Sequence, residues 1–158
     1  MKIGLTSESR KAIADKLGVL LANEFVLNVK TRKAHWNVQG LDFLDKHKLF
    51  EAQYEQYAGV IDDVAERIRI LGFFPPATAQ EFLNLATLSE TSVVVTDSKE
   101  LINNLLAGHE EIVRQLRGYA TEFAEEYGDD GSADFVIALM QDHEKTCLLY
   151  TSPSPRDA

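Results

Sequence analysis

The chain has 158 residues, 45% of them hydrophobic, which suits a single domain with its own core. Sixteen basic and 25 acidic side chains give a net charge of −9, and an acidic surface repels the phosphate backbone of nucleic acids. No segment approaches the roughly 20 apolar residues of a membrane span, and residues 1–11 lack the apolar core of a secretory signal. We therefore expect a cytoplasmic protein without a membrane span and without a general affinity for DNA.

Two long helices are predicted in the first half of the chain. The first covers residues 7–34, where apolar residues recur at helical spacing, with Ser7 or Ser9 as its cap and Gly40 as the breaker behind it. The second covers residues 44–71. Its apolar stripe follows alternating steps of four and three residues: Phe50, Tyr54, Tyr57, Ile61, Val64, Ile68 and Leu71.

A long connection follows, from Pro76 to Thr96. Residues 78–85 of this connection could form a short helix, with Phe82 and Leu85 pointing inward. A crossover of this length is what a ferritin-like bundle uses to make its second and third helices parallel.

Two further helices are predicted after the connection. The third begins at Asp97, which has capping-box spacing to Glu100, and runs to about Tyr127. The fourth is expected to be capped by Ser132. The predicted fold is therefore all-α, a ferritin-like four-helix bundle with a long crossover that carries a short extra helix.

The last segment, residues 147–158 (CLLYTSPSPRDA), breaks this pattern. One codon choice for residues 147–157 reads as a sequencing-library adapter, so we interpret the segment as a non-native tail and assign residues 1–146 to the ferritin-like domain. Cys147, the only cysteine, then supports neither a disulfide nor a thiol nucleophile. We expect the tail to cut the fourth helix off.

Candidate ligands gather in residues 33–72. His35 precedes Trp36, His47 lies near the start of the second helix, and Asp62 and Glu66, four residues apart, share a face that adjoins the core stripe. Two imidazoles and two carboxylates suit iron, and also zinc or manganese. Each residue also has an ordinary interpretation, as a structural histidine, a core aromatic or a solvated carboxylate. Spacing alone leaves both interpretations open.

The run KAHWNVQG at residues 33–40 is followed by His47, Phe50, Glu51 and Tyr54 and by DDVAERI at residues 62–68, and together these residues are similar to the signature of the Dps family of mini-ferritins. The resemblance extends from about Ser7 to Thr146. It implies a di-iron ferroxidase site at a subunit interface, with the histidines from one chain and Asp62 and Glu66 from its two-fold partner. Glu51 would be an added ligand or would contact a ligand from outside the metal site. Trp36 would lie beside the metals, where it could transfer an electron.

The resemblance also implies a homo-oligomeric shell of twelve subunits built from two-fold dimers. Iron would enter by acidic pores, where Asp130 and Asp134 match the family's pore region and Asp129 lies nearby. The alternative for these carboxylates is an acidic helix N-terminus stabilised by the helix dipole.

A site inside one bundle, of the kind ordinary ferritins build from Glu-x-x-His motifs, is not expected. No glutamate stands three residues before any of the four histidines; those positions hold Arg32, Leu44, Leu106 and Met140. We interpret His109 and His143 as structural.

The resemblance implies oxidation of Fe(II), preferably by hydrogen peroxide rather than O2, with storage of ferric oxide. DNA would be protected by removal of iron and peroxide, because only Lys2, Arg10 and Lys11 lie near the N-terminus and tight DNA binding or nucleoid association is not supported by charge. One alternative is a structural or DNA-compacting helical shell with an idle metal site. A zinc or manganese hydrolase is another, but no further polar cluster suggests a substrate cleft.

Overall fold

The computed structural model describes residues 1–152, and most of them belong to helices. The helices are α1 (Ser7–Asn37), α2 (Phe43–Ile70), α3 (Ala79–Leu85), α4 (Ser98–Glu125) and α5 (Asp130–Thr151). Among the residues described, the one piece of extended pairing is an isolated bridge between Gln39 and Asp97. The all-α prediction is confirmed.

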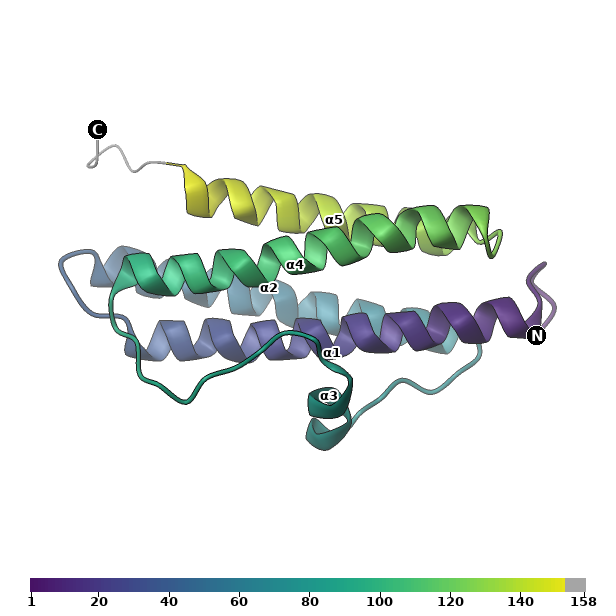
Figure 1. Cartoon of the computed structure of the whole chain (residues 1–158), viewed down its shortest axis with the longest axis horizontal. Helices are drawn as coiled ribbons and strands as arrows, with labels where there is room; N and C mark the ends of the chain where they lie inside the picture. Colours follow the sequence, from purple (N-terminus) through teal and green to yellow (C-terminus); the bar gives the residue numbers. More distant parts are fainter. Residues whose placement is uncertain (153–158) are drawn as a thin grey trace.

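The four long helices lie along a common axis (Figure 1). α1 and α2 form one antiparallel pair and α4 and α5 form another, while the crossover with α3 runs back along the outside so that α2 and α4 point the same way. This is the predicted ferritin-like connection. α3 packs against α1 through Phe82, whose ring lies 4.6 Å from that of Phe25. Leu85 is 38% exposed, so the expectation that it points inward was wrong.

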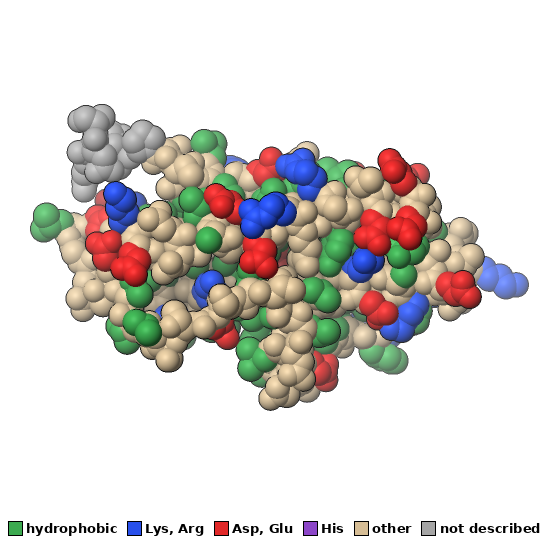
Figure 2. Space-filling model, viewed as in Figure 1, with side chains coloured by type: hydrophobic (Ala, Val, Ile, Leu, Met, Phe, Trp, Pro, Cys, Tyr) green, Lys and Arg blue, Asp and Glu red, His purple; other side chains and the backbone are tan. Residues whose placement is uncertain are grey.

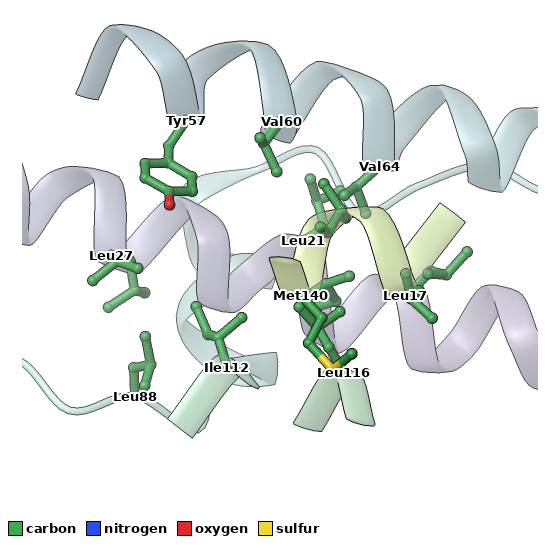
Figure 3. Packing of buried hydrophobic residues seen from close by; sticks show 14 of the residues in the cluster. Leu17, Leu21, Leu27, Tyr57, Val60, Val64, Leu88, Ile112, Leu116 and Met140 are labelled. Atoms are coloured by element: carbon green, nitrogen blue, oxygen red, sulfur yellow. The ribbon is translucent and has the colours of Figure 1, made fainter. Parts of the chain in front are cut away.

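The core fills the space between the four helices (Figure 3). It includes three leucines of α1, a tyrosine and two valines of α2, and side chains from α4, α5 and the crossover: Leu17, Leu21, Leu27, Tyr57, Val60, Val64, Ile112, Leu116, Met140 and Leu88. The stripe predicted for α2 is buried except at its edges, where Tyr54 and Ile61 are half-exposed. Burial of this apolar surface is the main favourable contribution to the stability of the bundle.

Helix caps differ from the sequence prediction at two places. Thr6, rather than Ser7 or Ser9, caps α1, because its hydroxyl accepts the Ser9 N–H at 3.0 Å. Asp129, rather than Ser132, caps α5, since its carboxylate accepts the Ser132 N–H at 3.0 Å. The predicted cap of α4 is confirmed by Asp97, which accepts the N–H of Glu100.

The end of α5 also differs from the prediction. The helix is not cut off at Cys147 but continues to Thr151. Tyr150 is 8% exposed and its hydroxyl donates a hydrogen bond to the side-chain oxygen of Gln53, so this turn is packed into the bundle. The non-native origin of residues 147–158 stays a prediction, and residues 153–158 of that segment lie outside the described part.

The face of the molecule in Figure 2 carries interspersed acidic and basic side chains without a continuous basic stripe. Exposed large hydrophobic residues include Trp36, Leu41, Phe43 and Leu44 at the α1–α2 turn. Over residues 1–152, no helix is both long enough and apolar enough to cross a membrane.

Candidate metal centre

The turn between α1 and α2 brings two histidines together. His35 lies in the last turn of α1 and His47 in the second turn of α2. Between them the chain reverses at Gly40, whose φ of +123° lies in the region that favours glycine. The turn is tied to the start of α4, because the Gln39 N–H donates to the carbonyl of Thr96 at 2.9 Å.

The two histidines fix each other's orientation. Nδ1 of His35 lies 2.8 Å from the carbonyl oxygen of His47, and Nδ1 of His47 lies 2.9 Å from the carbonyl oxygen of His35. Their rings stack at 3.7 Å between centroids. A carbonyl oxygen can only accept, so each Nδ1 carries a hydrogen and donates it. In the neutral imidazoles both Nε2 atoms then have free lone pairs, which is the state that binds a metal ion.

Two aromatic side chains of α2 flank this pair, one against each histidine. The ring of Phe43 stacks on His47 at 4.9 Å, and Tyr54 packs nearly perpendicular to His35 at 5.2 Å. The sequence prediction placed Tyr54 in the core stripe and missed this contact. The available signal was spacing, since Tyr54 follows His47 by two helical turns and so shares its face.

Two other predicted site residues, Trp36 and Glu51, lie close to the histidines in the sequence. Trp36 is 68% exposed, and Glu51, one turn beyond His47 on α2, is half-buried. The surface position of Trp36 leaves it available to contact another subunit.

Asp62 and Glu66 do not meet the histidines within one chain. Both are exposed on α2, and Asp62 lies fifteen residues beyond His47, which is about 22 Å along the helix axis. Across residues 1–152, no three side chains of the types that ligate metals converge on one point. A single chain therefore presents the predicted site as two separate halves.

The acidic residues at the start of α5 fall into two groups. Asp129 is 5% exposed, caps the helix and lies 3.7 Å from a guanidinium nitrogen of Arg67. Asp130 and Asp134 are exposed. The carboxylate of Asp129 is thus engaged within its own chain, whereas the other two face outward.

A second cluster of titratable groups lies inside the bundle. Glu24, His109 and His143 are each fully buried. Nε2 of His143 lies 2.6 Å from a carboxylate oxygen of Glu24, and its Nδ1 lies 2.8 Å from Nδ1 of His109. The two neighbours of His143 contact opposite ring nitrogens, so the three groups form a line and not a coordination sphere. Burial lowers the pKa of His109 well below its ordinary value.

Comparison with known proteins agrees with this architecture. A model of the ferritin-like domain matches residues 14–147. An uncharacterized low-temperature-induced protein of Nostoc sp. is 39% identical over 96% of this chain and 85% of its own length. A DNA protection during starvation protein of Helicobacter pylori is 34% identical over 77% of this chain and 86% of its own.

Among solved structures, a Dps protein of Vibrio cholerae, described as one of the ferritin-like diiron-carboxylate proteins, has a TM-score of 0.89. It is 31% identical and aligns over 95% of this chain and 93% of its own. The structural match therefore covers nearly the whole chain and the arrangement of its helices. The chain belongs to the Dps family of ferritin-like proteins.

Proposed function

We propose that this protein is a ferroxidase whose iron sites are completed between two copies of the chain, and that it stores the ferric product in a shell. The observation that carries the proposal is the divided ligand set. The two histidines direct their Nδ1 atoms to backbone carbonyls, which leaves the Nε2 atoms to bind a metal ion, while Asp62 and Glu66 are exposed on α2 about 22 Å and 28 Å beyond His47.

A two-fold axis would bring the halves together. If α2 of one copy packs antiparallel to α2 of another, with the axis near residue 55, the His47 end of each helix meets the Asp62 end of its partner. The surface at this level suits close approach: Gly59 is exposed, and a Cβ added there would meet nothing within 4 Å. Because a two-fold contact is isologous, each dimer would hold two equivalent sites.

The ligand set suits ferrous iron as the substrate. Two imidazoles and two carboxylates form a mixed nitrogen and oxygen site, and the carboxylates offset the added charge when Fe(II) becomes Fe(III). Two Fe(II) ions supply two electrons, and with two protons they reduce one hydrogen peroxide to two waters. Paired oxidation of this kind releases no hydroxyl radical. We therefore favour peroxide over O2 as the oxidant.

Storage follows from assembly into a hollow twelve-subunit shell, as the family resemblance implies. The exposed carboxylates of Asp130 and Asp134 would line the entry route for cations, while Asp129 supports the helix behind them. Relatives named for DNA protection during starvation, such as that of Helicobacter pylori, support a protective role. In the cytoplasm this chain would protect DNA by consuming iron and peroxide, since its net charge of −9 opposes direct binding.

The activity is tested by loading the metal-free protein with Fe(II) under anaerobic conditions and then adding hydrogen peroxide. We expect ferric absorbance to rise much faster than in buffer, and the fast phase to disappear in Asp62→Ala/Glu66→Ala. Asp63→Ala, an exposed carboxylate next to Asp62, is the matched control and should oxidise iron at the wild-type rate. Equal slow rates in all three proteins would favour the structural shell with an idle metal site.

The division between subunits has its own test. Chains carrying His35→Ala/His47→Ala are co-expressed with chains carrying Asp62→Ala/Glu66→Ala, neither of which is active alone. A mixed dimer regains one intact site, so random pairing should restore about a quarter of the wild-type sites. If both ligand halves belonged to one chain, the mixture would stay inactive.

A further inference from the structure

Tyr54 is held in place from two directions by residues of α1. Its ring lies under the guanidinium of Arg32, whose central carbon is 4.1 Å from the ring centroid. Its backbone carbonyl accepts a hydrogen bond from the side-chain amide of Asn28 at 2.8 Å. Asn28 also holds Arg32, because the side-chain oxygen of Asn28 accepts the Nε–H of Arg32 at 2.9 Å. The ring of Tyr54 therefore has little freedom to move.

The fixed ring is also the one that contacts a histidine of the candidate centre. Tyr54 packs at 79° to the ring of His35, with 5.2 Å between centroids. Edge-to-face contacts of this type are favourable and orient both rings. An unbroken series of contacts thus runs from Arg32 through Tyr54 to His35 and on to His47.

We propose that Tyr54, braced by Arg32, is a positioning residue for the His35–His47 pair, which sets how tightly the pair binds a divalent cation. The inference rests on the proposed function, since it concerns the same two histidines. Tyr54 itself supplies no ligand in this role. It restricts the His35 ring to the orientation in which its Nδ1 reaches the carbonyl of His47, so that less conformational freedom is lost when Nε2 binds a metal ion.

The test uses Co2+ alone as the probe and the full-length, metal-free protein. Visible absorption of bound Co2+ gives the affinity without any oxidation step. Tyr54→Leu should weaken Co2+ binding about two- to tenfold, the range that one edge-to-face contact is worth. Tyr54→Phe keeps the ring and should bind like the wild type. Rescue by phenylalanine separates positioning by the ring from any role of the hydroxyl group.

Arg32 is tested through its coupling to Tyr54. Removing a cation near the site changes metal affinity by charge alone, but that effect does not depend on residue 54. In an Arg32→Met background we therefore expect the loss caused by Tyr54→Leu to shrink at least about twofold. Arg69→Met is the matched control, because Arg69 sits 4.2 Å over Phe74 at the far end of α2 and should leave the Tyr54 effect unchanged.

Each outcome has a separate meaning. If His35→Ala/His47→Ala binds Co2+ as the wild type does, the metal centre itself is misplaced and the proposed function fails with it. If that double variant loses Co2+ binding but Tyr54→Leu binds with wild-type affinity, only the positioning role is overturned. Helical circular dichroism and the thermal midpoint of Tyr54→Leu establish that the variant is folded when its affinity is compared.

Discussion

Gly40 is the residue on which the turn between the two histidines depends. Its φ of +123° is one that L side chains rarely adopt, and the chain has to reverse there for His35 to reach His47. The position also lies next to the Gln39 bond that ties the turn to Thr96. Backbone conformation at this one residue therefore affects the geometry of the candidate centre.

Gly40→Ala should lower the free energy of unfolding by about 1 kcal/mol or more, because alanine is strained at this φ. The same change at Gly118 should have the opposite sign. Gly118 lies within α4, a Cβ there meets nothing within 4 Å, and Gly→Ala in a helix interior stabilises by about 0.5–1 kcal/mol. Denaturant midpoints of the two variants, measured on metal-free protein, should move apart. A stable Gly40→Ala would show that the turn tolerates another conformation.

Local sequence patterns predicted the ends of α2 but could not predict contacts between residues far apart in the chain. The period of α2 placed its ends within one residue, at 44–71 against Phe43–Ile70. Glu24 was missed because a single glutamate in a helix normally faces solvent, and its partner His143 lies 119 residues away. Asp62 and His47 are separated along one helix, and a single chain does not show whether a second copy brings such residues together.

At the scale of elements, a buried side chain of α1 helps to fasten the crossover between α2 and α4. Asn23, which is 1% exposed, accepts hydrogen bonds from the N–H groups of Thr87 at 2.8 Å and Leu88 at 3.2 Å. Its amide group donates to the Thr87 hydroxyl and to the side chain of Gln115 on α4. One residue thereby joins α1, the crossover and α4.

Asn23→Ala should cost about 1–3 kcal/mol of unfolding free energy, because it leaves two crossover N–H groups without their acceptor. The crossover should also become more sensitive to limited proteolysis, cut between α3 and α4 before the helices themselves. Asn84→Ala is the control. Asn84 is exposed on α3, and among the contacts described it forms a hydrogen bond only with Gln80, one turn away. The free energy of unfolding of this variant should therefore differ from that of the wild type by less than about 0.5 kcal/mol. Equal protease sensitivity in the two variants would contradict this role for Asn23.

At the scale of the whole molecule, the buried line of Glu24, His143 and His109 joins α1, α5 and α4 in the interior. Only one hydrogen fits between the two Nδ1 atoms that face each other at 2.8 Å. If His143 donates its Nδ1–H, His109 accepts it through its own Nδ1 as a neutral imidazole, while Nε2 of His143 faces Glu24. Tyr57 and Tyr150, whose rings contact this line, have pKa values raised by burial and stay neutral.

This arrangement predicts a specific sensitivity to acid. The pKa of His109 is depressed in the folded chain relative to its unfolded value of about 6.5, so the unfolded state takes up a proton first as the pH falls. The stability contribution is therefore complete above about pH 6.5 and is lost as the pH falls from there toward the folded pKa, by up to about 1.4 kcal/mol per pH unit. A proton on His109 would also place two N–H groups against each other and break its contact with His143.

His109→Gln should remove this dependence, because a glutamine oxygen can accept the His143 Nδ1–H and does not titrate. Urea midpoints of metal-free protein between pH 8 and pH 5 should fall more steeply for the wild type than for His109→Gln, by the equivalent of about one proton. Thr146→Val, which removes the partner of the Tyr57 hydroxyl at the same depth, should lower stability by an amount that does not vary with pH. Parallel pH curves for the wild type and His109→Gln would mean that another group sets acid stability. Different slopes would identify the buried line of Glu24, His143 and His109 as the place where acid destabilises the bundle.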